Sequence, residues 1–488
     1  MVENPAPGPG TIAEKLDGRR LLITGVTGFL GQAVFEKVLS DVPGARIVLL
    51  VRAQLSSSGR ARVEQLLKRP AFDSLRERHG ADGLLKLLDE RVEIVEGDFT
   101  QEPPAFPSDL DVVLHCAASV SFDPPIDEGF QTNILGALRF YEAVRDSGSK
   151  PHLVHVSTAY VAGMKKGVVT EATLDHRVDW RAEADLALTA RRDVEAASRK
   201  PELLDHFMEE ARKEHSRAGP QTVAGDAEQR RKDWVTKRLV NYGRARAQTL
   251  GWPDLYTFTK AMGERAVEEL ATSAGLPLSI VRPSIIESAL EHPFPGWIEG
   301  FKMAEPIILA YGRGAIPEFP GIPEGIVDII PADIVVNAML AVASTPPEPA
   351  TPAYFHVSSG NRNPLQYHGL YELVREYFEE HPLPERGRGE IRVPEWKFPG
   401  ALKVERMLST GERLVKAADQ VVSHLPKSKK MRDLVGKVDR DKNRLDFIRR
   451  YADLYGSYTE AEVIYTDDRT LALFRSLSAE DQTRFGFD

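Results

Sequence analysis

One pair of side chains in this sequence has the types and spacing for acid–base chemistry: Tyr256 and Lys260, in the run Tyr256-Thr257-Phe258-Thr259-Lys260. A pair at this spacing can arise by chance. Residues 261–267 continue the run as a good helix, however, so both side chains are expected on one helix face. A lysine cation beside a phenol favours the phenolate and is expected to lower the pKa of Tyr256 from its usual value of about 10. Tyr256 could then give a proton to the oxygen of a carbonyl group under reduction.

A third member of this site is expected from the end of the apolar run at 153–157, on the side of a parallel sheet where ligands bind. We assign Thr158 to hydrogen-bond the substrate oxygen. Ser157 is the alternative, and either hydroxyl could instead cap the strand end. Tyr160 is expected to pack, and the single cysteine, Cys116, has no base placed beside it. The predicted catalytic residues are therefore Thr158, Tyr256 and Lys260, and no metal site is predicted.

A glycine-rich turn near the start of the chain has the pattern GxxGxxG, one residue longer than GxGxxG. It follows an apolar run and precedes an amphipathic stretch. Gly25 permits a tight turn, Gly28 lets a pyrophosphate approach the backbone, and Gly31 lets the next helix pack closely. The turn predicts a dinucleotide site, and its predicted contacts are Thr24, Gly25, Thr27, Gly28, Phe29, Leu30 and Gly31.

The end of the second predicted strand bears on which nicotinamide cofactor is used. No carboxylate stands there for a ribose 2′-hydroxyl, whereas Arg52 suits a 2′-phosphate, so NADPH is favoured. The alternative is a solvated arginine at a strand end. Asp98 and Phe99 follow the third strand, and Ala117 follows the fourth; all three are expected near the cofactor, although each could be ordinary loop chemistry. Lys260 could also hold the nicotinamide ribose.

The elements that must position these residues alternate between short apolar runs and amphipathic stretches. The runs are rich in Val, Ile and Leu, as expected of parallel strands buried on both faces. This alternation predicts an α/β fold with a doubly wound parallel Rossmann sheet. The predicted strands are residues 20–24, 47–51, 92–95, 112–115, 153–157, 278–281 and 354–357.

Composition suggests the limits of the domains. Residues 1–16 are rich in Pro, Gly and Ala and are expected to form a flexible lead-in to a nucleotide-binding domain at 17–365. The charged stretch at about 165–252 predicts a helical insertion within that domain. No strand pattern is evident beyond about residue 363, so residues 366–488 are expected to form a helical C-terminal domain.

The net charge of −9 argues against a nucleic-acid partner, which requires a basic face. One cysteine gives no sign of an oxidising compartment. The chain starts without a signal-peptide pattern and has no run of 18 apolar residues. We therefore expect a cytoplasmic enzyme, with peripheral contact at a membrane surface left open.

Together these motifs resemble the extended short-chain dehydrogenase/reductase superfamily, and specifically the fatty acyl-CoA reductases. The resemblance covers about residues 17–365 and the C-terminal part more loosely. It extends to the long insertion between Thr158 and Tyr256, and it implies that Pro283 and Ser284 contact the cofactor. The motifs that carry it are residues 24–31, the Leu-Val-Arg ending at Arg52, residues 256–260, the run Val281-Arg282-Pro283-Ser284-Ile285-Ile286-Glu287-Ser288, and the run Pro293-Phe294-Pro295-Gly296-Trp297-Ile298.

This family resemblance implies reduction of a long-chain acyl-CoA by NADPH. A first hydride gives a hemithioacetal that collapses to aldehyde and free CoA, and a second NADPH can convert the aldehyde to a primary alcohol. Tyr256 would protonate the oxygen in the aldehyde step and Thr158 would hold it in both.

The stretch 427–444, rich in Lys and Arg, could meet a membrane surface or an anionic ligand, or be a solvated helix face. Residues 293–319 could line the acyl chain or simply pack in the core.

Three other functions remain open from the sequence. A related thioester reductase could stop at the aldehyde or take chains bound to a carrier protein. A sugar-nucleotide epimerase or dehydratase shares the tyrosine–lysine pair but shows no net NADPH consumption. A cofactor-sensing Rossmann protein without turnover is the alternative from another class, although such proteins commonly lack the catalytic tyrosine. Chain length and oligomeric state are not predicted.

Overall fold

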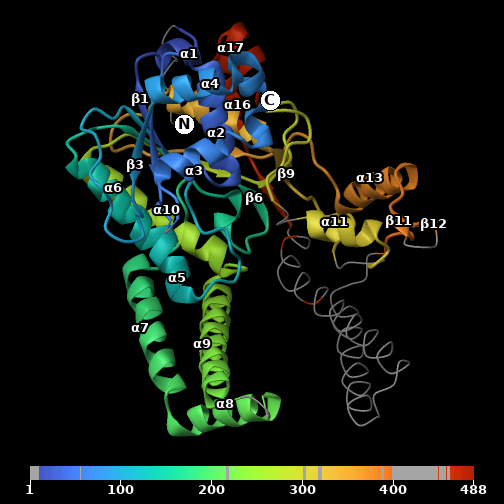
Figure 1. The fold of residues 1–488 in the computed structure, drawn as a ribbon. Helices are drawn as coiled ribbons and strands as arrows, with labels where there is room; N and C mark the ends of the chain where they lie inside the picture. Colours follow the sequence, from blue (N-terminus) through green and yellow to red (C-terminus); the bar gives the residue numbers. More distant parts are fainter. Residues whose placement is uncertain are drawn as a thin grey trace.

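The computed structural model describes residues 10–54, 56–215, 219–300, 304–316, 321–385, 389–397, 449, 458 and 462–488. Its centre is a seven-stranded sheet in the order β10-β7-β5-β4-β1-β2-β3, and every neighbouring pair is parallel (Figure 1). The predicted doubly wound sheet is confirmed, and each predicted strand lies within two residues of an observed one. The strands are β1 (Arg20–Thr24), β2 (Arg46–Val51), β3 (Val92–Glu96), β4 (Val112–His115), β5 (His152–Val156), β7 (Leu278–Pro283) and β10 (Ala353–Val357).

Helices cover both faces of this sheet, and each face has its own apolar core. On one face α2 (Phe29–Asp41) and α12 (Ala332–Ala343) pack together, and on the other α6 (Ala137–Asp146) packs against α10 (Leu255–Ala274). Coverage of both faces explains why the strands are continuously apolar. The other connecting helices are α1 (Ile12–Lys15), α3 (Gly59–Leu66), η1 (Pro70–Phe72), α4 (Asp73–Arg91), α5 (Ile126–Phe130), the π-helical turn η2 (Gln131–Gly136) and η3 (Ala159–Ala162).

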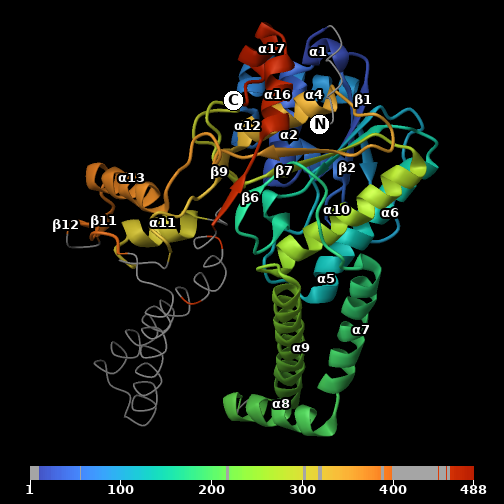
Figure 2. The same ribbon diagram turned by 180° about the vertical axis from the view of Figure 1, so that it is seen from behind.

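The predicted insertion is a helical arm. In Figures 1 and 2, α7 (Trp180–Ser198) and α9 (Pro220–Leu250) run side by side away from the sheet, and α8 (Pro201–Glu214) crosses their far end. Before the arm lies β6 (Gly167–Val169), a short strand outside the main sheet. The arm leaves and rejoins the domain between the elements that carry Thr158 and Tyr256.

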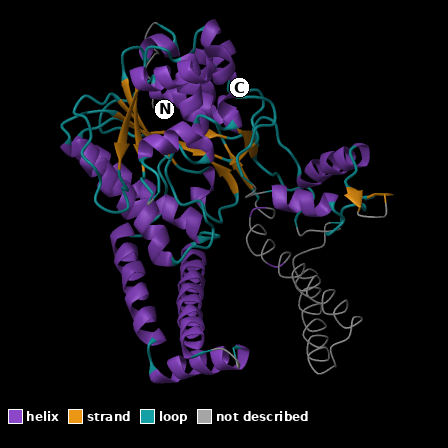
Figure 3. Ribbon diagram, viewed as in Figure 1, coloured by secondary structure: helices purple, strands orange, loops and turns teal. Residues whose placement is uncertain are grey.

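The described helices after residue 365 lie in two places. Its first helix, α13 (Tyr367–Glu380), packs against α11 (Glu305–Gly312) beside the sheet domain (Figure 3). The last helices, α16 (Asp468–Ser476) and α17 (Ala479–Arg484), return to the sheet domain near α2 and α12. A parallel two-stranded sheet, β8 (Ile285–Glu287) with β9 (Ile329–Pro331), lies between the last strands of the main sheet in sequence.

The expectation of no strand after about residue 363 was wrong. β11 (Pro384–Glu385) pairs with β12 (Gly389–Glu390), and β13 (Val463–Tyr465) pairs in parallel with β6. These strands have two or three residues each, too few for an alternating pattern to stand out, and the partner of β13 lies about 300 positions earlier in the chain.

Parts of several sequence predictions lie outside the described residues. They include residues 1–9 of the lead-in, residues 301–303 and 317–319 of the run at 293–319, and most of residues 398–461 of the C-terminal domain, with the whole basic stretch 427–444. Residues 10–16 are ordered, because Thr11 caps α1 through a capping box and Ile12 and Leu16 are buried. Within the described ranges, no helix combines the length and apolarity needed to cross a bilayer.

Candidate active site

The glycine turn between β1 and α2 has the geometry that a dinucleotide requires. Gly25 has φ of +76°, and a β-carbon there would lie 2.8 Å from the backbone nitrogen of Ala117. A β-carbon at Gly31 would lie 2.3 Å from the carbonyl oxygen of Gly25, so only glycine lets α2 approach the turn. Gly28 is the N-cap of α2, a helix of 13 residues, and has no side chain to cap it. The N-terminus of α2 therefore presents backbone N–H groups to which a pyrophosphate can bind.

The other residues predicted to contact the cofactor at this turn differ in their exposure to solvent. Thr27, Phe29 and Leu30 are partly exposed at the turn, and Phe29 packs against Trp297 with the rings tilted and their centres 5.0 Å apart. The Thr24 side chain is instead buried: its hydroxyl accepts from Ala117 N (3.2 Å) and bonds His115 Nδ1 (3.0 Å). Thr24 thus ties the ends of β1 and β4 together, and only its backbone is left for the predicted cofactor contact.

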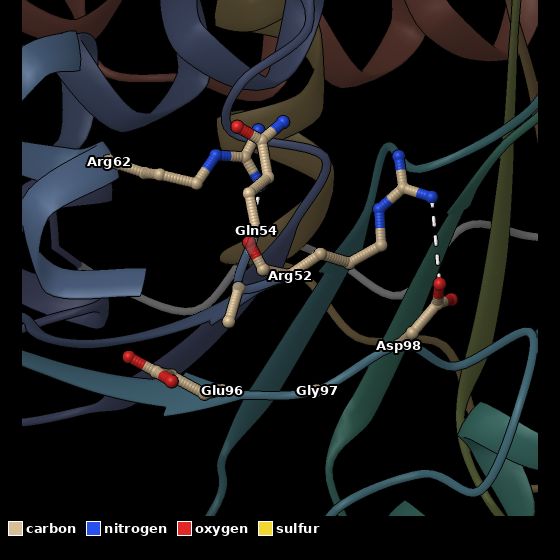
Figure 4. Close-up of a pocket in the computed structure, with 7 residues that line it drawn as sticks. Arg52, Gln54, Arg62, Glu96, Gly97 and Asp98 are labelled. Carbon is tan, nitrogen blue, oxygen red and sulfur yellow. Dashed lines mark hydrogen bonds and ion pairs between the residues drawn. The ribbon is translucent and has the colours of Figure 1, made fainter. Parts of the chain in front are cut away.

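Beyond the end of β2 lies a pocket of about 560 Å³, shown in Figure 4. Arg52 and Asp98 face each other across it, with Arg52 Nη1 3.6 Å from Asp98 Oδ2. Burial would raise the pKa of Asp98, but hydrogen bonds from Thr100 and the charge of Arg52 lower it below its ordinary value. Its lining residues are Arg52, Ala53, Gln54, Arg62, Glu96, Gly97 and Asp98.

Two details of this pocket differ from the sequence predictions. Arg62, on α3, brings a second guanidinium group and donates a hydrogen bond to the carbonyl of Arg52. No sequence pattern indicated Arg62, because only folding brings α3 back over the end of β2. Phe99, predicted as a cofactor contact, is buried, with its ring edge-on to His115 and its centre 5.7 Å away. It packs in the apolar core on the face of the sheet that α6 and α10 cover.

The three predicted catalytic residues come together at the carboxyl ends of β4, β5 and β7. Thr158 lies close enough to Tyr256 for its hydroxyl to lower the pKa of the phenol. Thr158 Oγ1 also lies 3.4 Å from the carbonyl oxygen of Pro283, at the end of β7. Lys260 Nζ donates to the carbonyl oxygen of Val156, the last residue of β5, at 2.6 Å.

The same lysine lies close to the glycine turn. Its charge acts on Cys116, whose carbonyl carbon would be 2.9 Å from a β-carbon on Gly25. Tyr256 is partly exposed, as a proton donor to a bound substrate must be. Ser284, predicted beside the cofactor, has a buried hydroxyl with no hydrogen-bond partner among the described residues. The acid–base pair and the nucleotide turn therefore share one edge of the sheet, where folds of this kind bind ligands.

The predicted effect of Lys260 on Tyr256 was wrong. Burial raises the pKa of Tyr256 well above its ordinary value, the carboxylate of Asp254 adds to the rise, and the Thr158 hydrogen bond offsets part of it. The lysine does not counter this, because its ammonium group is directed to Val156. Burial lowers the pKa of Lys260 itself to about 8, although the carboxylate of Glu264 favours its charge. The phenol is thus kept protonated, as a proton donor requires.

Two buried contacts that the sequence did not reveal hold α10 in place. The side-chain amide of Asn133, in η2, donates to Thr259 Oγ1 (3.0 Å) and to the carbonyl of Ser119 (3.1 Å). Arg282 and Glu264 form a two-pronged ion pair, at 3.0 and 2.7 Å, with both side chains at most 1% exposed. The first contact fixes α10 against η2 and the second fixes it against β7, so the position of Tyr256 and Lys260 is set from two sides.

Comparison with known proteins gives matches in both sequence and fold. Residues 23–339 match the family model described as male sterility protein. Fatty acyl-CoA reductase 1 of Arabidopsis thaliana is 32% identical over 390 residues, covering 78% of this chain and 74% of that protein. The alcohol-forming fatty acyl-CoA reductase of Simmondsia chinensis is 30% identical over 399 residues, covering 79% and 75%.

Among solved structures, the terminal R domain of the myxalamid PKS-NRPS biosynthetic pathway matches with a TM-score of 0.54 at 16% identity, covering 97% of this chain and 87% of that one. The reductase domain of a non-ribosomal peptide synthetase from Mycobacterium tuberculosis matches with a TM-score of 0.50 at 16% identity, covering 98% and 88%. At such identities these structures support the fold alone.

Proposed function

The chain belongs to the fatty acyl-CoA reductase family, and on that premise we propose that it reduces a long-chain acyl-CoA to the fatty alcohol, with NADPH as reductant and an aldehyde intermediate. The observation that carries this proposal is the meeting of Thr158, Tyr256 and Lys260 beside the glycine turn. Such an arrangement holds a carbonyl oxygen, supplies its proton and lies within reach of a bound dinucleotide.

The residues present fit NADPH. The glycine turn and the N-terminus of α2 would hold its pyrophosphate, Arg52 and Arg62 its 2′-phosphate, and Asp98 its adenine amine. When bound, this cofactor supplies the hydride that reduces the carbonyl carbon. The two guanidinium groups at the pocket favour NADPH over NADH, because only NADPH carries the phosphate they would bind.

In the first reduction, Thr158 and Tyr256 would hydrogen-bond the thioester oxygen and stabilise the charge that develops on it. The tetrahedral hemithioacetal then loses its C–S bond: the carbonyl re-forms, the hydroxyl proton leaves, and CoA departs as the thiol. In the second reduction, Tyr256 would give its proton to the aldehyde oxygen to yield the alcohol. Lys260 would hold the nicotinamide ribose.

Product analysis tests the reaction. Purified protein incubated with NADPH and acyl-CoAs of graded chain length should give long-chain alcohol, with two NADPH oxidised per alcohol, by mass spectrometry and absorbance. The relative from Simmondsia chinensis is named as alcohol-forming, which favours this outcome over a stop at the aldehyde. Aldehyde as the end product would support the thioester reductase alternative, and neither product would refute the proposal.

A second experiment tests the role of Tyr256. Tyr256→Phe should lower kcat by roughly a hundredfold or more while NADPH binding persists, because general acid catalysis contributes about that much. Tyr242→Phe is the matched control, since Tyr242 is 40% exposed on α9 and should retain full activity. Wild-type protein that binds NADPH but turns over no thioester would favour a cofactor-sensing protein.

A further inference from the structure

A tyrosine from the C-terminal part of the chain lies beside the catalytic tyrosine. Tyr458 is buried, and its hydroxyl donates to Asp254 Oδ2 at 2.6 Å. Asp254 is itself 5% exposed and is the N-cap of α10. Its other oxygen, Oδ1, accepts from the backbone nitrogen (2.8 Å) and the hydroxyl (3.1 Å) of Thr257. One carboxylate thus joins Tyr458 to the first turn of the helix that carries Tyr256.

The ring of Tyr458 touches the opposite wall of the same site. It packs against Tyr160, with ring centres 4.8 Å apart, and against Phe122, at 5.6 Å. Tyr160 belongs to η3, the turn that Thr158 caps, and Phe122 packs edge-on against Tyr256 at 5.8 Å. Tyr458 therefore contacts both turns that present the hydroxyl pair.

The chain on the C-terminal side of Tyr458 is anchored to the same region. β13 begins five residues later and pairs with β6, and Tyr465 on β13 packs against Tyr160 with ring centres 5.5 Å apart. Ser358, just after β10, donates to the carbonyl of Tyr465 at 3.2 Å. These contacts anchor β13 beside Tyr160, which is one of the residues that Tyr458 packs against.

We propose that Tyr458 is a positioning residue of the reductase: through Asp254 and Tyr160 it fixes the Tyr256 hydroxyl relative to that of Thr158. The role of Tyr458 in turnover rests on the proposed function, whereas its hydrogen bond to Asp254 does not depend on that function. A hydroxyl pair must be held in a narrow geometry to act on one oxygen, and a displacement of about 1 Å can cost a hundredfold in rate. Tyr458, a single residue from the C-terminal part of the chain, is thus a structural part of the catalytic site.

If Tyr458 acts through Asp254, the activity should depend on the protonation state of the Asp254 carboxyl group. Burial raises the pKa of Asp254 to about 6, against hydrogen bonds from Thr257 and Tyr458, and the charge of Asp123 adds to the rise. Asp123 is paired with Arg244 of α9, whose Nε lies 3.2 Å from it. If activity needs the charged carboxylate of Asp254 at the N-cap of α10, it should fall as the pH drops through about 6. Loss of the Tyr458 donor raises this pKa further, so the fall should begin at a higher pH.

The test compares Tyr458→Phe with Tyr377→Phe, which removes the hydroxyl of a tyrosine that is 59% exposed on α13. Tyr458→Phe should lower kcat by about tenfold, leave the KM for NADPH within about twofold, and move the acid limb to higher pH. Asp254→Asn should remove that limb. If Tyr458 acts through Asp254, the double variant should lose little more than the worse single variant. Tyr377→Phe should match the wild type in every measurement.

Hydrogen exchange tests the contact without a substrate. Amides of residues 255–260 should exchange faster in Tyr458→Phe than in the wild type, because the cap of their first turn has lost a partner. Unchanged exchange overturns the inference whether or not acyl-CoA is reduced. Faster exchange with unchanged kcat and pH profile also overturns it, since the contact is then only structural. If exchange rises but the wild type reduces no thioester, the proposed function fails and the contact between Tyr458 and α10 stands.

Discussion

At the scale of single residues, the pocket beyond β2 holds two guanidinium groups, of which the sequence singled out only Arg52. We predict that Arg62→Ala raises the Kd for NADPH by about 10- to 100-fold, because a hydrogen bond to a charged group contributes about 1.5–3 kcal/mol. NADH lacks the 2′-phosphate, so its Kd should change by less than about threefold. Fluorescence titration with each cofactor measures both constants.

The matched control is Arg145→Ala on α6. Arg145 is 44% exposed and paired with Asp146, so its removal should leave both constants unchanged. A loss of affinity that is equal for NADH and NADPH would contradict a phosphate role for Arg62, because it would indicate a general distortion of the pocket.

Lys260 has a consequence for the pH dependence of the reaction. Burial lowers its pKa from 10.5 to about 8, so the ammonium is fully charged only below that pH. We predict that kcat/KM falls with one-proton slope as the pH rises through about 8, because the proposed contact of Lys260 with the nicotinamide ribose needs the charge. Tyr256 does not contribute to this limb, since its own pKa is raised well above its ordinary value.

Lys260→Arg tests the assignment of this limb, because arginine stays charged throughout this range. The variant should be slower but should lose the alkaline fall near pH 8. Lys86→Arg on α4 is the control, at a side chain that is 76% exposed, and should reproduce the wild-type profile. An alkaline limb that persists in Lys260→Arg would show that another group titrates.

Much of the site could be predicted residue by residue, but not its electrostatics. The glycine turn and the spacing of Tyr256 and Lys260 are local patterns, and each can be recognised from a few consecutive residues. Burial and long-range partners are not local: the raised pKa of Tyr256 depends on its enclosure and on Asp254. Arg62 was missed for the same reason, since no spacing relates it to a phosphate.

At the scale of elements, the placement of α10 depends on the buried ion pair of Arg282 and Glu264. We predict that Arg282→Met lowers the free energy of unfolding by about 3–5 kcal/mol, because it leaves Glu264 charged and unpaired in the core. The same change should lower kcat, since β7 no longer holds the catalytic helix. Guanidinium denaturation and steady-state kinetics measure the two effects.

A double substitution distinguishes two causes of the lost stability: the unpaired charge of Glu264 and the smaller volume of the side chain at position 282. Arg282→Met combined with Glu264→Leu replaces the whole pair with apolar groups and should recover much of the lost stability. Arg145→Met, at an exposed pair, should change the free energy of unfolding by less than about 0.5 kcal/mol. If Arg282→Met is no more destabilising than Arg145→Met, the pair does not fix the helix.

The strands of the main sheet were predictable because burial on both faces leaves continuous apolar runs, such as β1 and β4, that stand out in any window. β6 and β13 were not, because β6 is largely exposed and each strand has three residues. The two strands lie about 300 positions apart in the sequence and pair only in the folded chain, so no local pattern could predict the pairing.

At the scale of the whole molecule, the last residues of the chain belong to the nucleotide-binding domain. Phe485 and Phe487 are buried in the same apolar core as α2 and α12. Asn337 on α12 donates to the carbonyl of Gly486 at 2.9 Å, and the backbone nitrogen of Ile12 donates to Asp481 at 3.0 Å. Both ends of the described chain therefore close over one face of the sheet.

This closure predicts how the molecule unfolds. Phe485 is fully buried, with the ammonium group of Lys37 from α2 5.2 Å from its ring centre. Phe485→Ala should therefore lower the free energy of unfolding by about 3–5 kcal/mol, as in the core of any single domain. Loss of NADPH binding should occur at the same denaturant concentration as loss of helical signal, because the C-terminal helices and the nucleotide site share one core.

Phe294→Ala is the control, since Phe294 is 39% exposed and its loss should change the free energy of unfolding by less than about 1 kcal/mol. Guanidinium titration followed by circular dichroism and by cofactor fluorescence measures both transitions. The alternative is a C-terminal unit that folds by itself. In that case Phe485→Ala would give an early partial transition, and the midpoint for NADPH binding would stay at its wild-type value.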